Sequence, residues 1–132
     1  MSKEFTSKDA EKYLKKAQDN FSEKDLNKVL EKEQDIKNKF SSSGPLGRFI
    51  EDFKLLMSVL KDYSTGKYRK IPWWAIAAIG GALLYVFSPI DAIPDFIPII
   101  GLIDDALVVA ACLMLVEQEL HRYKEWKTSQ AS

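Results

Sequence analysis

The hydrophobic positions divide this 132-residue chain into a charged first third, an amphipathic segment and a long apolar stretch. Residues 71–116 contain no lysine or arginine, and their only charges are four aspartates: Asp91, Asp95, Asp104 and Asp105. Residues 71–90 carry no charge at all, and their number is about what a helix needs to cross a bilayer. The pattern predicts that this stretch lies either in lipid or in a tightly packed core.

The remaining pattern favours helix, since no run keeps a period of two and no Asn-Gly or Asp-Gly hairpin dipeptide occurs. We predict an all-α fold, a small bundle of about four to five helices that contains an apolar helical hairpin. Residues 1–44 are predicted to form a charged helical arm. A first helix runs from Thr6 or Ser7 to about Asn20, and Ser22 with Asp25 resembles a capping box that begins the next.

The Ser, Gly and Pro cluster at 41–45 is predicted to separate this arm from a helical domain at 45–127, which 128–132 follow as a polar tail. Residues 46–63 are strongly amphipathic. Their polar face holds Arg48, Glu51, Asp52, Lys54, Lys61 and Asp62. Pro72 then suits the first turn of an apolar helix that runs to about Phe87. That helix would be about 24 Å long, short of a span of about 30 Å.

The proline-rich connector at 88–101 is the most unusual segment. Pro89, Pro94 and Pro98 stiffen it, since each restricts the residue before it. It also carries six large hydrophobes: Ile90, Ile93, Phe96, Ile97, Ile99 and Ile100. A solvated loop does not carry such a set, so we expect the connector to be buried in protein or in a membrane interface. Asp104 and Asp105 then begin a last helix that is predicted to continue to about Tyr123.

The flanks of the apolar stretch favour a membrane-seated hairpin. Basic residues precede its first helix and follow its second: Lys67, Arg69, Lys70, Arg122, Lys124 and Lys127. By the positive-inside rule both ends would be cytoplasmic, with the connector across or deep in the bilayer. Trp73, Trp74 and Trp126 stand beside these clusters, as interfacial aromatic residues do. Ala77 and Gly81, four residues apart, would allow close approach of a second helix.

The length of the second apolar helix argues against a full span. Only 106–116 are uncharged there, or about 17 Å. Two aspartates at its start would be costly in hydrocarbon, about 2.5–3.5 kcal/mol each at mid-depth. A full span, a re-entrant or interfacial hairpin, and a soluble bundle in which 46–63 covers the apolar surface therefore all stay open.

The stretch ALLYVFSPIDAIPDFIPIIGLIDD, with YRKIPW before it, resembles the YkvA-like family, a bacterial domain of unknown function. The matching positions are Tyr85, Ser88, Pro89, Asp91, Pro94, Asp95, Pro98, Gly101, Asp104 and Asp105. The resemblance covers residues 65–120. It implies association with a membrane, and it implies no activity, cofactor or ligand for this chain.

The four aspartates are the candidate metal ligands, because Mg²⁺ and Ca²⁺ prefer several oxygens. The alternative gives each a structural role: Asp91 completes a capping box with Ser88, Asp95 accepts backbone N–H bonds in the next turn, and Asp104 and Asp105 offset a helix end. A proton or ion relay within a membrane is a third possibility.

No other catalytic or metal-binding set emerges from the sequence. His121 is the only histidine, and the sequence offers it no partners for a zinc site. It also shows no Ser-His-Asp set for nucleophilic catalysis. Cys112 fits a small buried hydrophobe, and Gly80 with Gly81 fits close packing. The zero net charge argues against a nucleic-acid binder. We therefore predict no enzyme and no cofactor.

These features together predict a small bacterial membrane-associated protein on the cytoplasmic side that acts as a scaffold or interaction protein without catalysis. Its charged arm is expected to stay in water and contact a protein partner. One alternative is a soluble cytoplasmic interaction module whose connector is buried in its own core. The other is a site on the aspartates that handles divalent cations or other ions.

Overall fold

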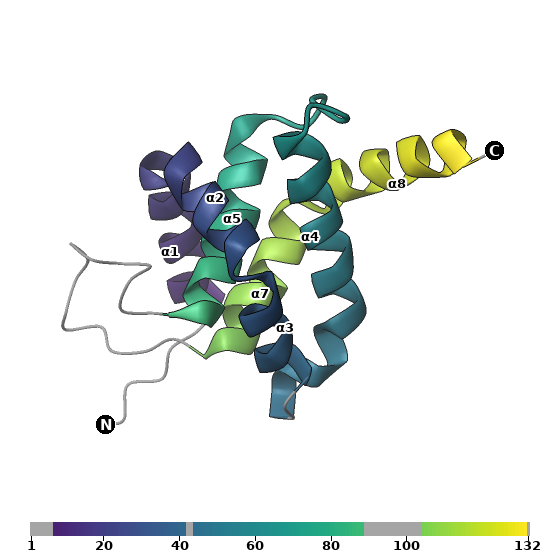
Figure 1. Cartoon of the computed structure of the whole chain (residues 1–132). Coiled ribbons are helices and arrows are strands. Elements are labelled where there is room, and N and C mark those ends of the chain that lie inside the picture. Colours follow the sequence, from purple (N-terminus) through teal and green to yellow (C-terminus); the bar gives the residue numbers. More distant parts are fainter. Residues whose placement is uncertain (1–6, 42–43, 89–103, 132) are drawn as a thin grey trace, which may run out of the picture.

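The structure is a computed structural model that describes residues 7–41, 44–88 and 104–131. These ranges are helical and contain no strand, so the predicted all-α fold is confirmed. In chain order the helices are α1 (Ser7–Asn20), α2 (Glu23–Glu31), α3 (Glu33–Ser41), the 3₁₀ helix η1 (Gly44–Phe49), α4 (Ile50–Ser64), α5 (Trp73–Phe87), α7 (Asp105–Leu115) and α8 (Glu117–Ala131) (Figure 1). The described part holds more helices than expected, because two predicted helices are divided at Lys32 and Val116.

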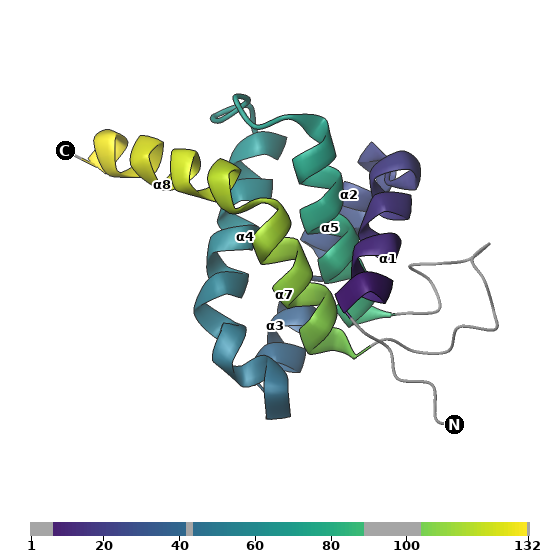
Figure 2. The same cartoon turned by 180° about the vertical axis from the view of Figure 1, so that it is seen from behind.

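The uncharged helix α5 lies at the centre of the bundle (Figures 1 and 2). It begins after Pro72 and ends at Phe87, as predicted. Helices α1, α2, α3, α4 and α7 all pack against it, and every residue from 75 to 86 is buried. A helix that is apolar on all sides has no face for water, so it is stable only when other groups surround it. Here the other helices of the same chain do so.

The first helix packs directly on α5. Tyr13 and Leu14 are fully buried, and the Tyr13 hydroxyl donates a hydrogen bond of 2.7 Å to the carbonyl oxygen of Gly81. The approach is close, because a Cβ at Gly81 would lie 2.6 Å from the Cβ of Ala17. The expectation that the arm stays in water is therefore wrong for the apolar side of α1. Its charged residues do face solvent, and the boundary drawn at residue 44 stays a prediction.

Local signals in the sequence account for several helix ends. The capping box of α2 is confirmed: the Ser22 Oγ accepts from the Asp25 N–H at 3.2 Å, and an Asp25 carboxylate oxygen accepts from the Ser22 N–H at 2.9 Å. The amphipathic segment 46–63 folds as η1 followed by α4, and it turns Phe53, Leu56 and Leu60 into the core. This segment thus covers part of the apolar surface.

The two helices of the predicted hairpin, α5 and α7, pack side by side. Val108 and Val109 of α7 are fully buried, and the Cys112 thiol donates to the Ala78 carbonyl oxygen at 3.7 Å. Residues 89–103 lie outside the described residues, so the burial of the connector stays a prediction. Among the described helices none is both long enough and apolar enough to cross a bilayer. A full span of the bilayer, one of the possibilities that the sequence left open, therefore finds no support in α5 or α7.

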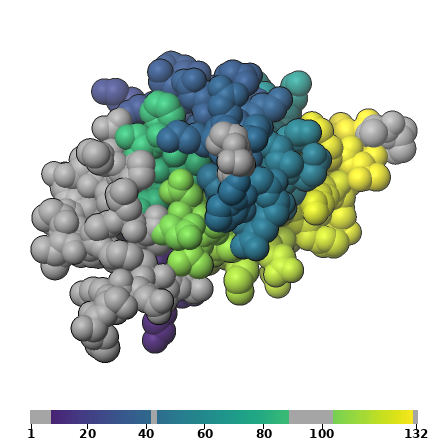
Figure 3. All heavy atoms as spheres, turned by 90° about the horizontal axis from the view of Figure 1, so that it is seen from below, coloured from purple at the N-terminus to yellow at the C-terminus, as the bar shows by residue number. Residues whose placement is uncertain are grey.

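The last predicted helix does not run on unbroken to Tyr123. Val116 leaves helical geometry with φ −103° and ψ 14°, so α7 ends there and α8 starts in a new direction. The break falls where apolar residues give way to the charged run EQELHRYKEW. As a result α7 packs in the bundle while α8 projects from the body (Figures 1 and 2), and the yellow atoms of α8 form one edge of the molecule in Figure 3.

Candidate functional site

The family-like motif is described only at its two ends. Tyr85 is fully buried in α5, and its ring centroid lies 5.1 Å from that of Tyr13. Ser88 follows α5, and its N–H donates to the Leu84 carbonyl oxygen at 2.8 Å. Six motif residues lie outside the described residues: Pro89, Asp91, Pro94, Asp95, Pro98 and Gly101. The part that is described serves packing and the end of a helix.

At the other end of the motif, Asp104 and Asp105 begin α7. The Asp104 carboxylate caps the helix by accepting from the Ala106 N–H at 2.7 Å. Burial raises the pKa of Asp105, the charge of Asp104 adds to this, and Lys39 opposes it. The described residues bring together no group of three potential metal ligands. A cation site would need Asp91 and Asp95, so the cation hypothesis stays a prediction.

A polar cluster that sequence reasoning missed joins α4 to α8. It consists of Ser58, Asp62, Tyr123 and Lys127. One Asp62 carboxylate oxygen accepts from the Tyr123 hydroxyl at 2.5 Å and from the Lys127 ammonium at 2.9 Å. The Ser58 and Tyr123 hydroxyls are also hydrogen bonded to each other. The side chain of Asp62 is only 10% exposed, so these bonds replace most of its water.

The charge states in this cluster argue for a structural role. Burial acts to raise the pKa of Asp62, but the hydrogen bonds from Tyr123 and Lys127 outweigh it and hold that pKa below its usual value. Burial, and then the hydrogen bond to Asp62, raise the pKa of Tyr123. The hydrogen bond to Asp62 raises the pKa of Lys127. Tyrosine and lysine thus hold their protons more tightly than usual, which is the opposite of what a general base needs.

The sequence carried one signal for this cluster. We placed Asp62 on the polar face of residues 46–63, and the structure buries it. It lies three residues beyond Val59 and seven beyond Leu55, so it continues a second, shorter inward-facing row of α4. Its partners are 61 and 65 residues away in the sequence. Only the folded chain reveals that pairing.

Aromatic and basic side chains gather where α4 turns into α5. The Trp73 ring lies 6.0 Å from Tyr63 and 6.1 Å from Phe21 between ring centroids. The Arg69 guanidinium lies 4.6 Å from the centre of the Tyr63 ring, and its Nε donates to the Tyr63 carbonyl oxygen at 2.7 Å. Trp74 is 39% exposed. The sequence predicted that tryptophan lies beside basic residues, but it did not predict these tilted ring contacts.

The basic residues of the two flanks have different surroundings. Lys67 and Lys70 are exposed and form no ion pair among the described residues, but the charge of Lys67 helps to lower the pKa of Asp62. Lys127 instead points to Asp62, and Arg122 pairs with Glu119 at 3.0 Å. The two flanks still meet, because Tyr68 in the turn lies 4.9 Å from Trp126 of α8 between ring centroids. We call Lys67, Arg69, Lys70 and Trp74 the basic-aromatic end.

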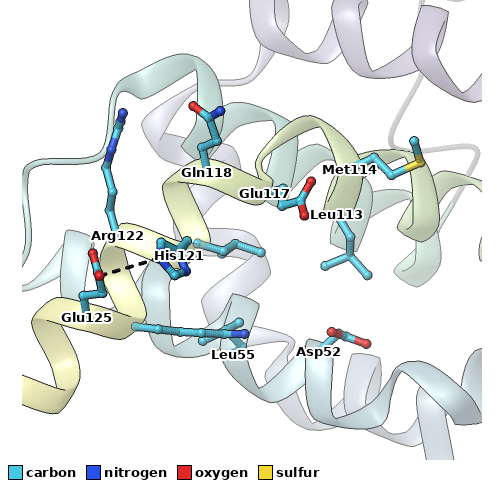
Figure 4. A pocket seen from close by; sticks show the side chains of 11 residues that line it. Asp52, Leu55, Leu113, Met114, Glu117, Gln118, His121, Arg122 and Glu125 are labelled. Atoms are coloured by element: carbon cyan, nitrogen blue, oxygen red, sulfur yellow. Dashed lines mark ion pairs between the residues drawn. The ribbon is translucent and has the colours of Figure 1, made fainter.

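An open groove of about 930 Å³ runs between α4 and the α7–α8 segment (Figure 4). Asp52, Met114 and Glu117 lie toward one end of it, and Arg122 and Glu125 toward the other. His121 lines this groove as an exposed residue, 3.6 Å from Glu125. No second metal ligand of the histidine or cysteine type accompanies it among the described residues. This agrees with the prediction of a surface histidine.

Cys112, the only cysteine, is a buried core residue of α7. Burial raises the pKa of its thiol to about 12, so almost none of it is the reactive thiolate at neutral pH. The prediction of a small buried hydrophobe is confirmed.

The described residues thus define an all-α bundle around an uncharged helix. Hydrophobic packing and the polar cluster around Asp62 hold it together. Residues 75–111 match the family model described as "Protein of unknown function (DUF1232)". The chain is also 32% identical over 78 residues to the "Uncharacterized membrane protein YkvA" of Bacillus subtilis (strain 168). That alignment covers 59% of this chain and 74% of the relative. No solved structure matches the chain.

This chain therefore belongs to the YkvA-like family of unknown function, and the resemblance seen in the connector motif is confirmed.

Proposed function

We propose that this protein is a non-catalytic, membrane-associated helical protein that contacts anionic lipid through its basic-aromatic end. The observation that carries the proposal is that Lys67, Arg69, Lys70 and Trp74 are all exposed and lie within residues 67–74 of the chain. The printed name of the Bacillus relative, a membrane protein, supports it. A scaffold or interaction role at the membrane is part of the same proposal.

The chemistry of this end suits an anionic lipid surface. Each lysine or arginine near such a surface contributes about 1 kcal/mol of attraction. Lys67 and Lys70 are exposed and form no ion pair among the described residues, although the charge of Lys67 is near enough to Asp62 to help lower the pKa of that carboxyl. Both ammonium groups can therefore reach phosphate groups from solvent. Tryptophan favours the interface because its ring is apolar and its N–H is polar. The positive charge would place this end at the cytoplasmic leaflet, which is rich in anionic lipid.

The packing of α5 determines which mode of attachment we propose. Helices of the same chain cover α5, so it offers no apolar face to hydrocarbon in this arrangement. A protein that rests on the headgroups through charge and tryptophan needs no such face. By sequence, the six large hydrophobes of the connector offer a second point of contact.

The soluble interaction module stays as the second candidate, and the same burial of α5 favours it. A chain that covers its own apolar helix does not require lipid for stability. In that case the charged outer faces of α1, α2 and α3 would be the surface for a protein partner.

Vesicle flotation tests the proposal. Wild-type protein should float with vesicles of phosphatidylcholine and phosphatidylglycerol, and much less with phosphatidylcholine alone. The double variant Lys67→Glu/Lys70→Glu should lose most of this binding. Lys15→Glu/Lys16→Glu is the matched control, because it makes the same charge change at two exposed positions of α1. Added salt should weaken the binding.

Three outcomes would contradict the proposal. Equal loss in both double variants would show that only the total charge matters. No flotation of the wild type would favour the soluble module. A third variant, Phe96→Asp in the connector, separates the two contact points: if it alone abolishes binding, the lipid contact lies in the connector and the basic-aromatic end is not the site.

A further inference from the structure

Residues from three helices, α3, α4 and α8, line a small pocket of about 270 Å³. Four lysines and two acids supply its charges: Lys37, Lys54, Lys61, Lys127, Glu33 and Asp62. Phe53, Met57 and Ser58 complete the lining. We call this site the lysine pocket. It shares no residue with the basic-aromatic end, so it is a separate site.

Ion pairs between helices hold the walls of the lysine pocket. The Lys61 ammonium of α4 lies 2.8 Å from a carboxylate oxygen of Glu33 in α3. The Lys127 ammonium of α8 lies 2.9 Å from a carboxylate oxygen of Asp62 in α4. The apolar part of the lining is well buried, since Phe53 is 1% exposed. The fold of the chain alone therefore builds this pocket.

The lining carries more positive than negative charge. Its two carboxylates pair with Lys61 and Lys127, whereas Lys37 forms no ion pair among the described residues. Lys54 pairs with Glu51, which lies outside the lining and is 81% exposed. An ion pair so open to water contributes little, so Lys54 can exchange this partner for another. A cleft with one excess charge beside apolar walls concentrates ions of the opposite charge.

We propose that the lysine pocket binds the phosphomonoester group of a small molecule. Such a group carries a charge of about −1.5 to −2 near pH 7, which matches the excess of two lysines in the lining. Its three oxygens can accept from several ammonium groups at once. A carboxylate or a phosphodiester carries one charge and would leave part of the excess unmatched. The pocket is slightly smaller than the usual range of about 300–1,000 Å³, so the attached group is small.

Titration of the full chain with inorganic phosphate tests the proposal. Ionic strength is held constant with sodium chloride, and amide chemical shifts are followed by NMR. Amides of the lining should shift in a saturable way below about 20 mM phosphate. Lys37→Gln should weaken this binding at least about fivefold, the effect of one unit charge at about 4 Å in water.

Removal of an acid should have the opposite effect. Glu33→Gln should strengthen phosphate binding, because it frees Lys61 and increases the positive excess. The matched controls are Lys24→Gln and Glu31→Gln, which make the same charge changes at exposed positions of α2 outside the lining. Both should bind phosphate as the wild type does. Circular dichroism melting checks that each variant is folded.

Three results would overturn the proposal: no saturable shift in the wild type, a Glu33→Gln variant that binds no more tightly, or equal changes in the α2 controls. Lys67→Glu/Lys70→Glu should keep the phosphate response, so this site and the lipid contact can fail independently.

A second measurement identifies the source of the phosphate. Vesicles of phosphatidylcholine with phosphatidic acid present a phosphomonoester, and vesicles with phosphatidylglycerol present a diester. If the ligand is a lipid headgroup, Lys37→Gln should reduce flotation mainly with phosphatidic acid. If it is a soluble phosphate ester, Lys37→Gln should float as the wild type does with both kinds of vesicle and still lose the phosphate shifts.

Discussion

Helices α5 and α8 are both fifteen residues long, yet the bundle holds them in opposite ways. α5 is uncharged and surrounded by helices, so many small contacts share its stabilisation. α8 is charged and projects from the body, and hydrogen bonds from Tyr123 and Lys127 to Asp62 anchor it to α4. Single substitutions should therefore affect the whole fold when they strike α5, and mainly one helix when they strike the anchor.

The largest effect is expected in α5. Ile76 is fully buried, and Ile76→Ala should lower the free energy of unfolding by about 2–5 kcal/mol, since the lost contacts leave a cavity. Chemical denaturation followed by circular dichroism measures this. Gln118→Ala, on the exposed side of α8, is the control and should change the free energy of unfolding by less than about 0.5 kcal/mol. Similar losses of stability in both variants would contradict the expected difference between α5 and α8.

The anchor of α8 comes next. Asp62→Ala leaves the Tyr123 hydroxyl and the Lys127 ammonium without their shared acceptor, which should cost about 1–3 kcal/mol. Hydrogen exchange should speed up in α8 while the amides of α5 keep their protection. Uniformly faster exchange in both helices would mean that α8 does not open separately.

A smaller effect is expected where α1 meets α5. Gly81→Ala places a Cβ against Ala17, and such overpacking costs about 1–3 kcal/mol. Alanine has a better helix propensity than glycine, and this offsets about 1 kcal/mol of the overpacking cost. Gly80→Ala would bring its Cβ to 2.2 Å from the far end of the Phe21 ring, and a side-chain rotation relieves that overlap more easily than the shift of a helix that Ala17 requires, so it should be milder. Thermal melting of the pair tests this order, and a milder Gly81→Ala would contradict it.

The smallest expected effect is in how stability depends on pH, to which Asp62 and Asp105 contribute with opposite signs. The pKa of Asp62 is lower in the folded protein than in the unfolded chain. Its stabilisation is therefore present above the unfolded value of about 3.9 and is lost as the pH falls through the folded value. The pKa of Asp105 is raised in the folded protein, so its ionisation opposes folding as the pH rises through that value.

Two variants separate these opposite signs in denaturation experiments across the acid range. Asp62→Asn should lose less stability on acidification than the wild type. The stability of Asp105→Asn should increase relative to that of the wild type as the pH rises from 3 to about 7. If both variants shifted in the same direction, at least one of the two assigned pKa directions would be wrong.

The sequence predicted the local features of the fold. Pro72, the Ser22 capping box and the switch to aspartate at 104 each begin a helix through chemistry that spans a few residues. The docking of α1 was not predictable, because Tyr13 and Leu14 form only a narrow stripe, and their partner surface depends on the missing side chain of Gly81. Sequence reveals amphipathic faces but not which faces meet.

The candidate site shows the same division. The exposed basic residues and tryptophans were visible as a composition pattern around 67–74. The polar cluster around Asp62 was not visible in the sequence, because its hydrogen bonds join residues more than sixty positions apart. The direction change at Val116 was missed as well, since no proline or glycine marks it.

The covering of α5 by α1 has a practical consequence for anyone who trims this chain. The family match at 75–111 takes in most of α5 and part of α7 but leaves out the four α-helices that precede them. A fragment cut to that match would present a bare uncharged rod to solvent and should precipitate or require detergent. Precipitation or a need for detergent would then result from the loss of the helices that cover α5. It would not show that the intact protein binds lipid.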